Sequence, residues 1–338
     1  MTAIAYFKSQ RFQALWLGLV IFGVLAQVFL FNLDLSKQAG IFIFFVLTLG
    51  MYHGLLDVIL LKEHQQALKK LTYFSPIMLY FSIVVASLCL FKLLPFITVP
   101  ILLLITVWHF GEQQGEQQSK YIGCHTQNLI TRFILGGASI SLPFFLAFTQ
   151  LDQLLQLMLV DRFSYHSAIL IWQIISYTWL LTLSCYLVCW LLIALFTVFK
   201  FNSGKYTKIE TVFKNILNTE QGAELYILLL SFYLLPLLLA FTLYFAAYHS
   251  LRHIADIHCE HRIRIFLQPI LMVSLASLLL LIAAFYVFPM QQFLTSTILQ
   301  HLMYILSATI VLITAITIPH AGLISTWRYK LLNSKLVT

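Results

Sequence analysis

Charged side chains are scarce in this chain of 338 residues. Asp, Glu, Lys and Arg make up 9% of it, whereas soluble domains carry about 25%. Apolar residues account for 61% of the chain and gather in runs of about 18 residues or more, long enough to cross a hydrocarbon layer of roughly 30 Å. This pattern excludes an ordinary water-soluble globular protein and indicates an integral membrane protein.

Cysteine is also sparse, with five residues in the chain. An odd number, placed mostly inside apolar runs, argues against a disulfide framework. The formal net charge is +8, but the sequence has no basic tract with interleaved aromatic residues, so no nucleic-acid partner is predicted. An excess of Lys and Arg is instead typical of the cytoplasmic loops of membrane proteins.

Nine apolar segments follow one another with short connections between them. They cover residues 14–31, 40–61, 74–94, 96–110, 129–148, 168–199, 223–248, 266–288 and 298–324. Only helices and closed barrels satisfy the backbone in lipid, and the short alternating strands of a barrel are absent. We therefore predict an all-α fold: a polytopic transmembrane helical bundle of eight to nine spans, forming a single integral membrane domain over residues 1–338.

The segment 129–148 decides the number of spans. Its middle contains Gly136, Gly137, Ser139, Ser141 and Pro143, which predict a break in the helix. If the segment is re-entrant, eight segments cross, and more Lys and Arg then fall on the inner side than in the nine-span alternative. The first apolar run follows two basic residues and has no cleavage site after it, so we predict a retained first span and a cytoplasmic N-terminus.

Histidine is the polar residue that stands out within these apolar runs. Several of the eleven histidines lie inside the runs or at their ends, and the five that carry the argument are His53, His109, His249, His253 and His320. Ionisable side chains at membrane depth are costly and mark functional sites. His249 and His253 are four residues apart, which places both on one helix face and can supply two nitrogen ligands to a metal.

Four of these residues, His53, His109, His249 and His253, together predict a metal site. Neutral imidazoles suit iron, copper, zinc or nickel. The alternative for each is a hydrogen bond between helices, and an isolated i, i+4 pair also occurs by chance. In the eight-span topology the histidine-bearing runs point the same way, so their ends can meet at one depth.

Three further residues have supporting roles to weigh. Asp57 lies four residues after His53 and could hold its second ring N–H, or else be a helix-end charge at the interface. Glu112 follows His109 by three residues and could support it in a similar way, but a position in a solvated loop is favoured. His320 is a fifth ligand, a neighbour behind the ligands or a helix-packing residue.

Four motifs occur in order along the chain. They are His53-Gly54 with Asp57, His109-Phe110-Gly111, His249-Ser250 with Arg252 and His253, and Pro319-His320. Their order and spacing resemble the Brp/Blh-type membrane β-carotene 15,15'-dioxygenases of bacteria and archaea, over about residues 40–325. The chain departs from that pattern at Tyr52, where Pro is expected, and at Ser325, where Asp is expected.

The resemblance implies a non-haem Fe(II) enzyme that cleaves the central double bond of β-carotene with O2 to give two all-trans-retinals. The implied iron ligands are His53, His109, His249 and His253, with Asp57 and His320 behind them. The implied location is the lipid bilayer of the bacterial inner (plasma) membrane, and the implied recipient of retinal is a microbial rhodopsin.

Aromatic residues next to the histidine motifs are candidates to contact the polyene. They are Tyr52, Trp108, Phe110, Tyr244 and Tyr248. Aromatic faces can stabilise positive charge that develops on a substrate. The alternative for each is a lipid-facing or interfacial position.

Two other classes of protein remain open. A membrane di-iron desaturase or hydroxylase is one, although such enzymes use more histidines and adjacent His-His pairs, which this chain lacks. A haem-binding or transport membrane protein is the other, because histidines on facing helices can hold haem or relay protons.

Overall fold

The computed structural model describes residues 3–27, 34–52, 54, 56–57, 60–61, 76–119, 125–159, 162–201, 219–261, 278 and 298–336. The first helices are α1 (Ala3–Leu25), α2 (Leu35–Phe45), η2 (Val46–Gly50), α4 (Pro76–Leu93), α5 (Pro95–Ser119), α6 (His125–Leu146) and α7 (Phe148–Met158). The others are α8 (Arg162–Phe201), α10 (Thr219–Leu234), α11 (Leu237–Thr242), η3 (Leu243–Ser250), α12 (Leu251–His261) and α15 (Ile298–Leu336). Throughout the described residues the fold is helical, without a β-strand, and this confirms the all-α prediction.

Three of the described helices are long and apolar enough to cross a membrane. They are Pro95–Glu112, Phe163–Cys189 and Tyr304–Thr326, and the bent pair α6–α7 makes a fourth candidate. Shorter apolar helices cover Gln13–Leu25, Leu35–Gly50, Met78–Leu93 and Gly222–Leu234. The helices are thus compatible with a membrane protein, but the predicted count of eight to nine spans is not confirmed. The predicted segment 266–288 lies outside the described residues except for residue 278.

The break expected in segment 129–148 lies at its end. α6 continues through Gly136, Gly137 and Pro143, and the chain then bends by 96° at Ala147, before α7. The two glycines permit close packing instead. A Cβ on Gly136 would lie 1.9 Å from the Val107 carbonyl oxygen of α5, and one on Gly137 would lie 2.5 Å from the Trp179 ring of α8.

The run 223–248, predicted as one segment, is broken at Leu235–Pro236. Proline lacks a backbone N–H and cannot continue the hydrogen-bond ladder of α10. Gln150 of α7 stabilises the restart, because its Oε1 accepts a hydrogen bond of 2.8 Å from the Leu237 N–H at the start of α11.

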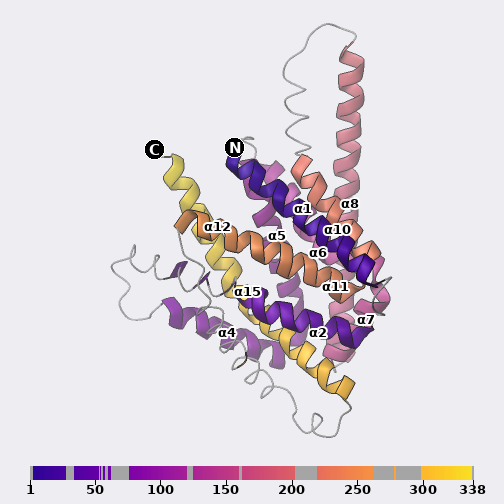
Figure 1. The fold of residues 1–338 in the computed structure, drawn as a ribbon, viewed down its shortest axis with the longest axis vertical. Helices are drawn as coiled ribbons and strands as arrows, with labels where there is room; N and C mark the ends of the chain where they lie inside the picture. Colours follow the sequence, from indigo (N-terminus) through magenta and orange to yellow (C-terminus); the bar gives the residue numbers. More distant parts are fainter. Residues whose placement is uncertain are drawn as a thin grey trace.

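The bundle is organised around α5, α6 and α15. α5 packs along α6, α6 packs on α8, and α15 contacts α2, α4 and α5. α8 extends beyond the other helices (Figure 1) and carries exposed apolar side chains such as Leu181, at 66% exposed. The histidine-bearing parts of α5 and α15 therefore lie inside the bundle, while α8 presents an apolar outer face.

Candidate active site

Four buried histidines lie together where α5, η3, α12 and α15 meet. The ring centroid of His109 is 5.2 Å from that of His249 and 4.8 Å from that of His320, and His320 is 5.4 Å from His253. Each of the four residues is at most 3% exposed. The structure thus brings three of the four predicted ligands together with His320, while the fourth, His53, lies outside the described residues.

The donor set suits a transition metal. Buried imidazoles favour iron, copper, zinc or nickel over magnesium or calcium. In the part of the chain that the structure describes, no three His, Cys, Asp or Glu side chains are placed closely enough to hold an ion by themselves. A complete metal site therefore needs His53, or small movements that bring the imidazole rings closer together, or both.

Asp57 is fully buried and holds His320. The Asp57 carboxylate oxygens lie 2.8 Å and 2.9 Å from His320 Nδ1, and one of them accepts a 2.7 Å hydrogen bond from the Tyr80 hydroxyl. An ionised carboxylate only accepts, so Nδ1 carries the proton. The alternative of an interfacial charge is wrong for Asp57, because the residue has no exposed surface.

Tyr80 was not predicted to belong to this group. It lies in the apolar run 74–94 and carries no motif. A tyrosine in such a run is typical of an interfacial belt. Only the fold of α4 against α15 shows its role, which is to share the carboxylate of Asp57 with His320.

The two π-helices meet beside His249. A Cβ on Gly50, the last residue of η2, would lie 2.8 Å from the Phe245 ring of η3, so glycine permits the contact. Phe245 stacks on His249 with centroids 5.8 Å apart, and Phe110 contacts His249 edge-on at 4.7 Å. π-Helical turns are common at functional sites. The predicted i, i+4 geometry assumed a regular helix, whereas His249 lies in η3 and His253 in α12.

A buried ion pair fixes the helix that carries these two histidines. Arg252 donates to Glu224 of α10 over 2.5 Å and to the Tyr248 hydroxyl over 2.7 Å, and Tyr248 also donates to Glu224. The carboxylate and the guanidinium are both buried. Glu224 was missed in the sequence, although an acidic residue at the start of the apolar run 223–248 is a signal of such a partner.

Glu112 is buried, and its predicted place in a solvated loop is wrong. It is 7% exposed and accepts a 2.5 Å hydrogen bond from the Ser325 hydroxyl, which links α5 to α15. Ser325 is a position where the family pattern predicts Asp. A second carboxylate there would repel Glu112, so the serine is the complementary choice in this chain.

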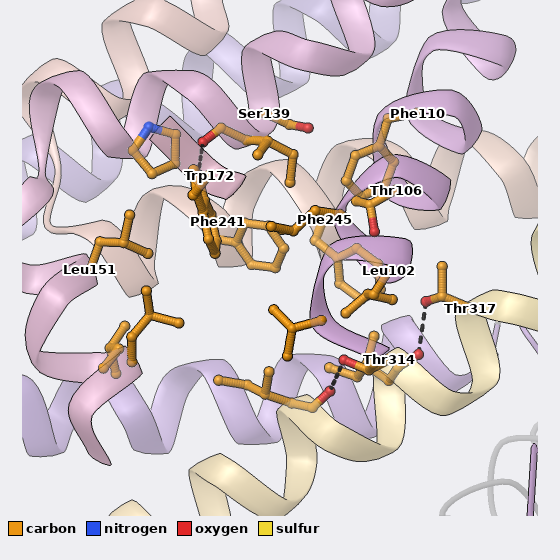
Figure 2. A pocket seen from close by; sticks show the side chains of 18 of the residues that line it. Leu102, Thr106, Phe110, Ser139, Leu151, Trp172, Phe241, Phe245, Thr314 and Thr317 are labelled. Atoms are coloured by element: carbon orange, nitrogen blue, oxygen red, sulfur yellow. Dashed lines mark hydrogen bonds between the residues drawn. The ribbon is translucent and has the colours of Figure 1, made fainter. Parts of the chain in front are cut away.

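An apolar cavity of about 200 Å³ begins at His109 and His320. Its lining includes Phe110 and Thr106 of α5, Thr317 of α15, and residues of α6, α7, α8 and α11. Figure 2 shows Leu151 on the opposite side of this cavity from Phe110 and Thr317. No Asp, Glu, Lys or Arg is among the described lining residues.

Of the five aromatic residues predicted to contact a polyene, Phe110 lines the cavity. Trp108 points away from it, being 43% exposed with Arg132 over its ring at 5.4 Å. Tyr52 packs in a separate apolar cluster, and Tyr244 and Tyr248 pack near the Trp16 ring. Adjacency to a histidine in sequence is a poor guide here, because neighbouring residues of a helix point in different directions.

Phenylalanines that are not next to a histidine motif in the sequence line the cavity instead. Phe241 and Phe42 line the cavity, and Phe241 stacks on Phe245 with centroids 5.8 Å apart. Phe245 in turn stacks on His249. A row of aromatic rings therefore leads from the cavity wall to His249.

Comparison with known proteins agrees with the resemblance drawn from the motifs. A family model described as beta-carotene 15,15'-dioxygenase matches residues 44–328, a range that includes the predicted ligands and the cavity-lining parts of α5, α6, α7 and α15. Neither the curated proteins nor the solved structures that were compared with the chain include a significant match. Since the family match spans most of its length, the chain belongs to the β-carotene 15,15'-dioxygenase family and is an enzyme of the carotene dioxygenase type.

Proposed function

We propose that this enzyme cleaves the central 15,15' double bond of β-carotene with O2 and yields two molecules of all-trans-retinal. Both oxygen atoms of O2 end as the two new aldehyde oxygens, so no external reductant is needed. The observation that carries the proposal is the apolar cavity that opens directly onto His109 and His320. The family match supports the reaction class.

We assign one Fe(II) to His109, His249 and His253, together with His53. The burial of the three described rings and the series of ring contacts from His249 to His109, from His109 to His320 and from His320 to His253 support this assignment. His320 lies between His109 and His253, and Asp57 holds its Nδ1 in the way that carboxylates hold metal-ligating histidines, so we include His320 as a fifth nitrogen donor to the same ion. When bound, the iron supplies O2 binding and activation; the protein residues supply the binding site and its orientation.

The cavity supplies the environment for a polyene. β-Carotene has no hydrogen-bonding groups, and the lining matches this chemistry. The hydroxyls of Thr314 and Thr317 donate to the backbone carbonyls of Ile310 and Ile313, so their polarity is satisfied within α15. Such walls hold the alkene in register next to the histidines and exclude water.

The chemistry of the substrate and the product also indicates where the enzyme acts and what receives its product. β-Carotene dissolves in the bilayer, and a chain whose exposed helices are apolar can receive it there. We place the enzyme in the bacterial inner membrane, with O2 as second substrate. A retinal-binding membrane protein of the microbial rhodopsin kind would take up the product.

Expression in a β-carotene-producing bacterium tests the reaction. We expect the orange colour to fade and all-trans-retinal to accumulate on chromatography. A strain that expresses the protein at the same level yet stays orange without retinal would contradict the proposed function.

Substituting Asp57 by asparagine tests its support of the histidines. The amide keeps the shape of the side chain but loses the charge that orients His320, and we expect iron affinity and retinal formation to fall about 10–100-fold. Iron affinity is measured by chelator competition. Tyr80→Phe is the matched control: it leaves the contact between Asp57 and His320 in place and should have a smaller effect. Equal iron affinity in Asp57→Asn and the unmodified protein would contradict the assigned role.

A further inference from the structure

The cavity follows two helices over the same length. Along α5 the lining extends from Val99 to His109 and the adjacent Phe110, and along α15 it extends from Ile310 to His320. Ten residues of α-helix rise about 15 Å, at about 1.5 Å per residue. The cavity lies along these two helices and therefore extends about 15 Å from the histidines.

This depth corresponds to half of a carotenoid. An extended chain advances about 1.2 Å per bond, taken from about 3.5 Å for three backbone bonds. About 15 Å then accommodates about twelve bonds. That is the extent of β-carotene from its central double bond to the far edge of one ring.

α7 closes the end of the cavity away from the histidines. Leu151, Leu154 and Leu155 of this helix line it, and all three are buried. The 96° bend at Ala147 turns α7 across the direction of α6. Leu151 is the labelled residue farthest from Phe110 and Thr317 in Figure 2.

Polar contacts hold this wall in place. Gln150 accepts the hydrogen bond from the Leu237 N–H of α11, and Asp152 accepts one from the Tyr165 hydroxyl of α8. α7 also contacts α15. These contacts join α7 to three neighbouring helices, so its leucine face lies at a fixed distance from His109 and His320.

We propose that the leucine face of α7, formed by Leu151, Leu154 and Leu155, is the stop against which a carotenoid ring rests, and that it determines which double bond lies at the histidines. The inference rests on the proposed function. It makes these leucines specificity-determining residues: the distance from stop to histidines selects the central bond of a symmetrical substrate. Moving the stop should move the position of cleavage without removing the activity.

Variants of the wall test this inference through product length. Leu151→Phe and Leu155→Phe each shorten the cavity, and we expect cleavage to shift to the neighbouring double bond. The single aldehyde from β-carotene is then replaced, for the larger share of product, by a shorter ketone and a longer aldehyde, because the neighbouring double bond carries a methyl group. Chromatography with mass spectrometry resolves the two products. Gln153→Phe adds the same ring on the exposed side of α7 and should leave retinal as the sole product.

The unmodified protein offers a second test that does not depend on folding of a variant. A carotenoid shortened at one end and intact at the other should be cut at the same distance from its intact ring as β-carotene. The proposed stop would be contradicted if both folded wall variants still gave retinal as the sole product. It would also be contradicted if the shortened substrate were cleaved at its own new centre. Failure of the unmodified protein to cleave any carotenoid would instead contradict the proposed function.

Discussion

Replacing His249 with alanine is expected to abolish iron retention and retinal formation. His249 is 2% exposed and lies against His109, Phe110 and Phe245. Residues that only support a metal ligand cost about 10–100-fold when removed, so loss of a ligand should lower activity by more than about 100-fold. Iron per purified chain and retinal from β-carotene are the two measurements.

A histidine outside the cluster gives the control. His166 is exposed on α8 and contacts the Tyr165 ring, far along the chain from any motif. His166→Ala should keep iron and activity at the level of the unmodified protein. We expect His53→Ala to behave like His249→Ala, and full iron occupancy in either of these two variants would refute that residue as a ligand.

Substituting Gly136 by alanine is expected to cost about 3 kcal/mol or more, at or above the upper end for overpacked sites, because the obstruction is backbone. The added Cβ would lie 1.9 Å from the Val107 carbonyl oxygen and 2.6 Å from the Gly111 nitrogen. Both atoms belong to the turns of α5 that flank His109. The helices must separate, which lowers the melting temperature in detergent and weakens iron retention together.

Gly322→Ala is the matched control for this effect. Gly322 lies on α15, two residues after His320, and no atom lies within 4 Å of the position where its Cβ would be. Alanine in place of glycine within a helix is favourable by about 0.5–1 kcal/mol. We therefore expect an unchanged or slightly raised melting temperature. An equal loss in both variants would contradict the close-packing account of Gly136.

The helical class and the identity of the clustered histidines could be predicted from the sequence. Long apolar runs leave helices as the regular structure for the backbone, and rare polar residues in such runs mark a site. The proximity of His109 to His249 follows from that reasoning, although they are 140 positions apart by number. The family could also be predicted, because its motifs are short but ordered.

The partners of these residues could not be predicted, because they depend on tertiary packing. Asp57 contacts His320, which is 263 positions away in the sequence, whereas the sequence pattern indicated only its near neighbour His53 as a partner. The glycines of segment 129–148 look like helix breakers in sequence, yet Gly136 serves an interhelical contact. Cavity-lining aromatics such as Phe241 carry no motif, so only the helix arrangement distinguishes them from lipid-facing residues.

Iron analysis of the detergent-purified chain, combined with X-ray absorption at the iron edge, is the decisive test of the histidine-bound iron. We expect close to one iron per chain, coordinated by imidazole nitrogens and without the intense Soret band of haem. A ratio close to two irons per chain, or a haem spectrum, would contradict it and point to one of the other two classes of protein.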